Sequence, residues 1–546
     1  MKSSTISNTL SAASQTTDST NEGLNLAHES LADLIEQAMD KNATEMAYQC
    51  LGQTLTFADI DKKSSALAKY LLEVAQLNAG DRVIIQLPNL TQYPIAAYAV
   101  IRAGLVLVNT NPLYTTREMQ HQFSDSGAKA IIILADLLPK LAAIIEQTNI
   151  NTVIATHAID LIQPKTINEN KVLSANLISF SESLKLGSEF STISRQPINI
   201  NDIAAIQYTG GTTGLSKGAV LTHKNLLSNV MQASERLSSV AVEGEECFVT
   251  PLPLYHIYAL LLNLWVFSEG NNNILIPNPR DIEGFIDTLM INKVTGFCGI
   301  NTLFIGLCSH PKIKEVNFDL LKFTISGGAA LTSTGTDNWH KITGCTIAEG
   351  YGLSETSPVV TLNEPGKEQL GTIGLPVIGT EVQIWNDDGR EVKQGETGEL
   401  VVRGPQVMQG YWQQPQETQK VLTHDGWLKT GDIALRKSNG FFQIVDRKKD
   451  MIIVSGFNVY PNEVEDILMS HPDIFEAAVV GEICPKSGEL VSAFIVQKPN
   501  IDLSYQEIIS YCRELLTPYK VPKKMIFVNE LPKSSIGKVL RKELRK

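Results

Sequence analysis

The sequence predicts an α/β fold, and three observations support this prediction. Apolar runs typical of strands alternate with helical segments from about residue 26 onward. Between about residues 371 and 403 the pattern changes to short strands separated by turns, and beyond residue 450 a short α+β pattern runs to Lys546. Because strand–helix alternation favours layers built on parallel sheet, we expect a large N-terminal domain of layered sheets. A small β-barrel or meander and a small C-terminal α+β domain complete the prediction.

The first elements follow in order along the chain. Leu31, Ile35 and Met39 have helical spacing and mark where folding begins. We then expect strands at 82–87, 105–109 and 128–134, with helices at 94–103 and 116–126. A second round of alternation runs from 203 to 328, beginning with the apolar run 203–206. After the 446–450 boundary we expect a strand at 451–454 and a helix from residue 462.

Three units follow from this organisation. Residues 1–25 are polar and rich in Ser and Thr, without the apolar core of a signal peptide, and are predicted to be a disordered tail. Residues 26–448 form the predicted N-terminal domain, and residues 449–546 form the predicted C-terminal domain, with the boundary at Lys449.

Composition excludes several classes of function. The chain has 546 residues and a net charge of −12, from 46 Lys+Arg and 58 Asp+Glu, which argues against nucleic acid as a partner. The seven cysteines show no CxxC or Cys/His ligand spacing, so a zinc site and a disulfide framework are not expected and a reducing cytosol fits. Neither of the most apolar stretches, 93–108 and 254–267, gives the roughly 20 apolar residues of a spanning helix. We therefore expect a soluble protein, with surface association to a membrane left open.

The most specific motif is YTGGTTGLSKG at residues 208–218. Glycines let backbone N–H groups approach phosphate oxygens, hydroxyls add donors, and a lysine adds positive charge. The spacing does not fit a Walker A loop. The motif therefore predicts an anion-binding loop, and the alternative is a flexible surface loop.

This loop resembles the phosphate loop of the acyl-adenylate-forming superfamily, which includes acyl-CoA synthetases, peptide-synthetase adenylation domains and luciferases. Further motifs of that family follow in order: PLPLYH at 251–256, SGGAAL at 326–331, EGYGLSET at 349–356, GEL at 398–400, TGD at 430–432, DRKKD at 446–450 and KSSIGK at 533–538. The resemblance extends from about residue 27 to the end. It is closest to bacterial long-chain fatty-acid–CoA ligases, on stretches 111–115, 404–408, 445–451 and 455–463.

The resemblance implies a reaction in two steps. A fatty carboxylate attacks the α-phosphorus of ATP and expels pyrophosphate, and the thiol of CoA then attacks the acyl carbon and expels AMP. Both steps create negative charge on oxygen, so placed cations and N–H donors are the expected catalysts. The implied cofactor is Mg²⁺, which prefers hard oxygen ligands, and the implied co-substrates are ATP and CoA.

The resemblance also assigns residues to the nucleotide. The expected ATP- and AMP-binding residues are Thr209, Gly210, Gly211, Thr212, Thr213, Gly214, Lys217, Gly327, Gly328, Ala329, Glu349, Gly350, Tyr351, Gly352, Ser354, Asp432, Arg447 and Lys538. Within this set the loop holds the β- and γ-phosphates, Tyr351 stacks on adenine, and Asp432 accepts hydrogen bonds from the ribose. The expected metal ligands are Glu355 and Thr209.

Three catalytic residues are implied: Lys538, Glu355 and Thr209. Lys538 would contact the α-phosphate and the reacting carboxylate and offset the repulsion between the two anions. Without the motif Lys538 is one of several lysines in a basic tail, and Glu355 is a helix-cap carboxylate. In the same way Tyr351 is a core aromatic residue and Arg447 a surface ion pair.

The acyl and CoA sites are implied next. His256, Tyr258 and Leu260 are expected to border the acyl group, with His256 positioning the substrate rather than acting as a base. Lys449 matches the hinge about which the mobile C-terminal domain rotates between the two steps. Ser455 and Gly456 are expected to line the CoA channel, where a missing side chain permits close approach.

The expected activity is therefore a long-chain fatty-acid–CoA ligase that forms AMP. Its expected partners are a long-chain fatty acid, ATP, CoA and the cytoplasmic surface of the inner membrane, with a homodimer left open. The same chemistry on a medium-chain, aryl or amino acid is one alternative, and a luciferase-type oxygenase is another. A non-catalytic lipid-binding relative is a third, against which Lys217, Glu355, Asp432 and Lys538 are all present.

Overall fold

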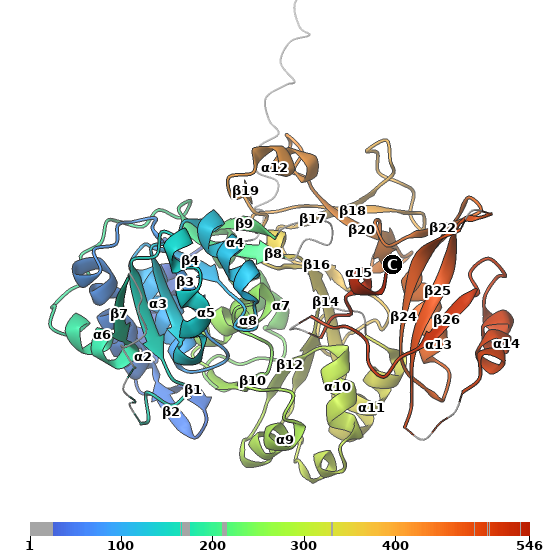
Figure 1. The fold of residues 1–546 in the computed structure, drawn as a ribbon. Helices are drawn as coiled ribbons and strands as arrows, with labels where there is room; N and C mark the ends of the chain where they lie inside the picture. Colours follow the sequence, from blue (N-terminus) through green and yellow to red (C-terminus); the bar gives the residue numbers. More distant parts are fainter. Residues whose placement is uncertain are drawn as a thin grey trace, which may run out of the picture.

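The computed structural model describes residues 24, 26–163, 165, 167, 175–209, 216–328, 331–484, 486–499, 501, 503–534 and 537–545, apart from the side chain of residue 334. Apart from Leu24, the predicted tail lies outside the described residues, as do residues 210–215 of the phosphate loop and Ala329. Four sheets carry the described chain, three in the N-terminal body (24–447) and one in the C-terminal lobe (452–545). The lobe lies to one side of the body (Figure 1).

The first sheet has eight strands in the order β19-β9-β8-β4-β3-β5-β6-β7. These are β3 (Arg82–Gln86), β4 (Val106–Asn109), β5 (Ala130–Leu134), β6 (Thr152–Thr156), β7 (Asn176–Ser179), β8 (Ile203–Thr209), β9 (Lys217–Thr222) and β19 (Gly410–Tyr411). Strands β8 to β7 pair in parallel, whereas β9 and β19 are added antiparallel. The predicted strands at 82–87, 105–109 and 128–134 are confirmed within two residues.

The second sheet has nine strands in the order β16-β15-β14-β13-β12-β10-β11-β1-β2. These are β1 (Met46–Cys50), β2 (Gln53–Thr56), β10 (Cys247–Thr250), β11 (Asn272–Leu275), β12 (Gly296–Gly299), β13 (Phe323–Ser326), β14 (Ile347–Gly352), β15 (Val359–Leu362) and β16 (Leu375–Pro376). Its centre, from β14 to β1, is parallel. Ligands of parallel α/β sheets bind beyond the carboxyl ends of the strands, where β13 and β14 here deliver two of the predicted motifs.

Helices connect and cover the strands of the body. They are α1 (Leu31–Lys41), α2 (Phe57–Lys69), α3 (Gln92–Arg102), α4 (Thr116–Ser126), α5 (Leu138–Ala142), α6 (Phe180–Gly187), α7 (His223–Leu237), α8 (Ile257–Ser268), α9 (Ile282–Ile291), α10 (Asn301–Ser309), α11 (Ser333–Thr343) and α12 (Pro415–Val421). The predicted helix at 116–126 is confirmed at both ends, where Thr115 caps the first turn and Gly127 closes the last in a left-handed conformation.

Two helices explain the most apolar stretches of the sequence. All residues of α3 and ten of the 12 residues of α8 are buried. A helix that is apolar on all sides lies in a protein core or a membrane, and α8 is too short for the latter. Within the described ranges no helix is both long and apolar enough to span a bilayer.

The predicted barrel or meander is a four-stranded antiparallel sheet. Its strands are β17 (Glu381–Trp385), β18 (Thr397–Arg403), β20 (Leu428–Arg436) and β21 (Phe442–Arg447), in that order, with β17 and β21 at the edges. The last strand ends at Arg447, directly before the predicted boundary.

The C-terminal lobe has its own sheet and its own core. It contains β22 (Ile452–Val454), β23 (Phe457–Val459), α13 (Pro461–Met469), β24 (Ile474–Cys484), β25 (Gly488–Gln497), α14 (Tyr505–Leu515), β26 (Lys524–Phe527) and α15 (Arg541–Leu544). The long pair β24–β25 forms its centre, and β26 joins β25 in parallel. Side chains of α13, α14 and this sheet form a separate hydrophobic cluster, as expected for an independent α+β unit.

One close packing contact in the body gives a test of the fold. An ideal Cβ on Gly187 of α6 would lie 1.8 Å from the backbone carbonyl oxygen of Ala66 on α2. Because backbone atoms cannot rotate away, Gly187→Ala must separate the two helices, and overpacking of this kind costs about 1–3 kcal/mol. We expect a lower Tm in a thermal denaturation experiment.

The matched control is Gly306→Ala on α10, where the nearest atom to an added Cβ is Ile282 Cδ1 at 3.5 Å. Alanine in a helix is favoured over glycine by about 0.5–1 kcal/mol, so this variant should keep or raise the Tm. An unchanged Tm for Gly187→Ala would contradict the described packing of α2 and α6.

Candidate active site

Predicted motifs that are distant in sequence meet at the carboxyl ends of β13 and β14. Gly327 follows β13, and an ideal Cβ on it would lie 3.5 Å from the carbonyl oxygen of Gly350 and 3.5 Å from the ring of Tyr258. Gly328 adopts a φ of +84°, a conformation that glycine reaches without strain. The structure therefore brings together the expected adenine residues and one of the expected acyl residues.

A tyrosine, a carboxylate and an arginine form the centre of this site. The Tyr351 hydroxyl donates to Asp432 Oδ2 at 2.6 Å, and Arg447 Nε lies 3.1 Å from Asp432 Oδ1. The pairing of β20 with β21 sets Asp432 directly opposite Arg447, so the register of two strands fixes the ion pair. Asp432 is only 3% exposed. Desolvation, followed by the charge of Asp432, raises the pKa of Tyr351, which therefore stays a hydrogen-bond donor.

The C-terminal lobe brings Lys538 to the same place. An ideal Cβ on Gly537 would lie 2.6 Å from Ile300 Cδ1 and 2.8 Å from Thr302 Oγ1, so this loop sits directly against the start of α10. Desolvation lowers the pKa of Lys538 to about 8, with Arg447 contributing in the same direction and Asp432 opposing it. Lys538 is thus a cation that an anionic ligand at this position would stabilise.

His256 lies within electrostatic reach of Lys538. Desolvation, followed by the charge of Lys538, lowers the pKa of His256 to about 4. The ring is therefore neutral at pH 7, and its Nδ1 accepts the backbone N–H of Tyr258 at 3.3 Å, which caps α8. This contact leaves Nε2 to carry the proton as a donor, in accordance with a positioning role.

The other expected acyl residues differ in their surroundings. The Tyr258 hydroxyl is shielded from solvent and has no hydrogen-bond partner in the described part of the chain. Leu260 is fully buried in the main hydrophobic core. Of these two residues, Tyr258 is thus the one with a hydroxyl group that lacks a described partner, on a ring that lies beside Gly327. The contribution of Leu260 stays a prediction.

A second group of charges lies where β9 and β19 meet. Lys217 Nζ is 2.6 Å from Glu417 Oε2 and 4.9 Å from the ring centroid of Tyr411. The Tyr411 hydroxyl donates to Glu355 Oε1 at 2.8 Å. Thr209, at the end of β8, faces Lys217 across the β8–β9 pairing. Tyr411 therefore connects Lys217 with Glu355, Thr209 lies opposite Lys217, and Ser354 directly precedes Glu355 in the chain.

The donor set fits Mg²⁺. Glu355 and Thr209 supply carboxylate and hydroxyl oxygens, which are the hard ligands that this ion prefers, and only one Glu355 oxygen is engaged by Tyr411. Across the described ranges no group of three or more His, Cys, Asp and Glu residues could hold a metal alone. An ion here would therefore need phosphate oxygens and water to complete its shell.

The predicted hinge residue and the predicted CoA residues lie on opposite ends of β22. Lys449 is exposed and lies within electrostatic reach of Arg447 and Asp450. Ser455 and Gly456 form the turn between β22 and β23 with φ values of +52° and +86°, and both are exposed. This turn is fixed by the Ser455 N–H bond to the Ser487 carbonyl at 2.7 Å, on the surface of the lobe. In this arrangement Lys538, and not the turn, reaches the site.

An arginine that the sequence did not single out joins the lobe to the boundary segment. Arg541 binds Glu465 Oε2 at 2.6 Å and Asn462 Oδ1 at 2.5 Å, and its Nη1 lies 3.4 Å from Asp446 Oδ1. Burial raises the pKa of Asp446 to about 6, although Arg541 opposes this shift. The basic run near the C-terminus was the only sequence signal for this contact.

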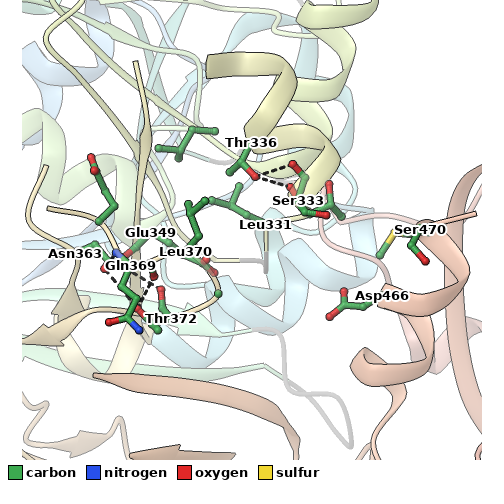
Figure 2. A pocket seen from close by; sticks show the side chains of 15 residues that line it. Leu331, Ser333, Thr336, Glu349, Asn363, Gln369, Leu370, Thr372, Asp466 and Ser470 are labelled. Atoms are coloured by element: carbon green, nitrogen blue, oxygen red, sulfur yellow. Dashed lines mark hydrogen bonds between the residues drawn. The ribbon is translucent and has the colours of Figure 1, made fainter. Parts of the chain in front are cut away.

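A cavity of about 260 Å³ lies between body and lobe, next to the expected adenine residues. Figure 2 shows Asp466 of α13 and Ser470, which follows this helix, on one side of it and Glu349, Leu370 and Thr372 on the other. Desolvation raises the pKa of Glu349 to about 8, so its carboxyl group is largely protonated at pH 7 and can donate a hydrogen bond.

Comparison with known proteins decides the family. A model described as AMP-binding enzyme matches residues 35–412, and one described as AMP-binding enzyme C-terminal domain matches residues 463–538. The chain belongs to the AMP-binding enzyme family. The long-chain-fatty-acid–CoA ligase of Salmonella typhimurium is 44% identical over 532 residues, covering 95% of this chain and 94% of that protein. The ligase of the same name from Bacillus subtilis is 38% identical over 538 residues and covers 95% of each chain.

Solved structures of the family agree with the architecture. ATP-bound MatB from Rhodopseudomonas palustris matches with a TM-score of 0.82 and 27% identity, covering 94% of this chain and 98% of that one. An anthranilate CoA ligase, AuaEII, in complex with anthranoyl-AMP matches with a TM-score of 0.85 at 23% identity, which supports the fold alone. The three sheets of the body and the smaller lobe thus match the architecture of solved AMP-binding enzymes.

The Asp432 ion pair gives a prediction for the ligand-free protein. Asp432→Asn leaves Arg447 without its counter-ion, and we expect the free energy of unfolding to fall by about 1–3 kcal/mol. Tyr351→Phe removes a hydrogen bond to this charged carboxylate and should cost about 1.5–3 kcal/mol. Chemical denaturation measures both variants, and an unchanged free energy of unfolding in either would contradict the described geometry.

Proposed function

We propose that this AMP-binding enzyme activates long-chain fatty acids to acyl-CoA through an acyl-adenylate, consuming ATP and CoA and releasing pyrophosphate and AMP. The observation that carries the proposal is the position of Lys538, which lies within electrostatic reach of Asp432, Arg447 and His256. The long-chain acid is proposed from the relatives, six of which carry that name at 42–44% identity over 95% of this chain.

In the first half-reaction two anions must approach each other. The fatty carboxylate attacks the α-phosphorus, the bond to the bridging oxygen breaks, and pyrophosphate leaves with the electron pair. We assign Lys538 to neutralise the charge between carboxylate and α-phosphate. Asp432 and Arg447 hold the ribose, and Tyr351 lies against adenine with Glu349 at its edge. A single preorganised cation or donor of this kind is typically worth about 100- to 1000-fold in rate.

The leaving pyrophosphate is assigned to the second group of charges. Lys217 at the end of the phosphate loop would bind the β- and γ-phosphates, and Thr209 and Glu355 would hold the metal. When bound, Mg²⁺ neutralises the charge that develops on the phosphates. Tyr411 donates to Glu355 and thereby keeps its carboxylate in one orientation.

The second half-reaction needs a different arrangement. The CoA thiol must reach the acyl carbon, whereas in the described arrangement the loop of Lys538 lies against the start of α10. We assign the change to a rotation of the lobe at Lys449, which lies between β21 and β22. Hinges of this kind absorb backbone rotation at the ends of elements. The rotation would carry Ser455 and Gly456 from the surface to the site, where glycine leaves room for the pantetheine arm.

The acyl group of the substrate is assigned to a site bordered by His256, Tyr258 and helix α8. His256 is neutral and donates through Nε2, which suits a group that orients a carboxylate and does not need to remove a proton. The insolubility of long-chain acids supports a cytoplasmic enzyme that works at the surface of the inner membrane.

The test is a product analysis across acid classes. With ATP, Mg²⁺ and CoA, the enzyme should convert palmitate to palmitoyl-CoA with one AMP per thioester, and it should turn over octanoate and benzoate less efficiently in kcat/KM. Thioester from benzoate alone would keep the chemistry and overturn the proposed substrate. No AMP from any acid would overturn the enzymatic assignment in favour of a lipid-binding protein.

A further inference from the structure

Lys217, the lysine that we assign to the phosphates of ATP, has an anionic partner within the chain. Lys217 Nζ lies 2.6 Å from Glu417 Oε2, and the two side chains are 30% and 32% exposed. Glu417 belongs to α12, a short surface helix about 200 residues away in sequence. The lysine assigned to the β- and γ-phosphates is thus neutralised by a carboxylate when no nucleotide is bound.

The local structure holds Glu417 in place without fixing it rigidly. Strand β19 pairs with β9 at Tyr411 and Ala219, and the Tyr411 N–H donates to Thr418 Oγ1 at 2.9 Å, which ties α12 to the site. Lys420, one turn further along α12, contacts Glu417 Oε1. The carboxylate therefore has a second cation to which it can turn when Lys217 is taken.

Charge decides what happens when polyphosphate arrives. Hydrogen bonds from Lys217 and then Lys420 lower the pKa of Glu417 to about 2, so the group is anionic at any working pH. Phosphates close to Lys217 would repel this carboxylate. Ion pairs that are partly exposed contribute about 0–1 kcal/mol, so a nucleotide with several negative charges can displace it.

We propose that Glu417 is an exchange counter-ion, which holds Lys217 in the empty site, gives it up to the phosphates of ATP and takes it back as pyrophosphate leaves. This inference rests on the proposed function insofar as Lys217 binds phosphate. By competing for Lys217, Glu417 weakens the binding of ATP and of pyrophosphate alike, and speeds the departure of the product. Such a group changes the affinity for both ligands and leaves the chemical step unchanged.

Glu417→Gln is the direct test, with the magnesium complexes of pyrophosphate and ATP as probes in isothermal titration calorimetry. Removing the competing charge should tighten binding of both about two- to five-fold, the range that a partly exposed ion pair provides. The inhibition constant of pyrophosphate in the steady state should fall by the same factor. The gain should shrink at high salt, because screening weakens the pair that is lost.

The matched control is Glu182→Gln on α6. It removes the same charge from another exposed ion pair, the one that Glu182 makes with Lys185. It makes the same change in net charge and should leave both affinities unchanged. In a Lys217→Gln background Glu417→Gln should have a clearly smaller effect, because the competition for that lysine is already gone and only the direct repulsion between carboxylate and phosphate is relieved.

Three results would overturn the inference. They are equal or weaker binding in Glu417→Gln, the same gain in Glu182→Gln, and the same gain in the Lys217→Gln background. The proposed function fails separately: if the wild-type enzyme turned over no acid but Glu417→Gln bound magnesium pyrophosphate more tightly, the counter-ion role would stand and the ligase would not. An active enzyme with unchanged affinities would overturn the counter-ion role alone.

Discussion

The proposed adenylation step depends on one electrostatic arrangement, in which Lys538 of the C-terminal lobe lies within electrostatic reach of the Asp432–Arg447 pair of the body. Desolvation and the neighbouring guanidinium both disfavour the charged lysine, and Asp432 alone among the main contributors favours it. An anionic ligand, such as a carboxylate close to a phosphate, would therefore stabilise the charged form of Lys538. The contacts of Gly537 with α10 and of Arg541 with the boundary segment keep the lobe in this position.

Lys538 and Lys217 differ in the part of the chain that supplies them and in their ion pairing. Lys538 arrives from a separate lobe and lacks a carboxylate within ion-pair distance among the described contacts, so its charge is available to the reacting groups. Lys217 lies on a strand of the body and is paired with Glu417 at 2.6 Å. A partly exposed pair is easily exchanged, which suits a group that must bind a leaving product and release it. Tyr411 connects Lys217 with Glu355, so the proposed phosphate and metal sites are both held by this residue.

Local patterns predicted much of the fold, and long-range contacts set the limit. The helix at 116–126 and the strands at 82–87 and 105–109 depend on capping residues and apolar runs that lie within the segment itself. The meeting of Lys217, Tyr411 and Glu417 depends on the pairing of β19 with β9, which joins residues almost 200 positions apart. No local pattern encodes that register, so Tyr411, Glu417 and Arg541 were found only in the structure.

The most direct test separates the two half-reactions in a Lys538→Ala variant. Acyl-adenylate formation from palmitate and ATP is measured without CoA, and thioester formation is measured from synthetic palmitoyl-adenylate and CoA. The account predicts that the first rate falls about 100-fold or more while the second stays within a few-fold of the wild-type enzyme. Equal losses in both half-reactions, or no loss in the first, would contradict the role of Lys538 and the arrangement built on it.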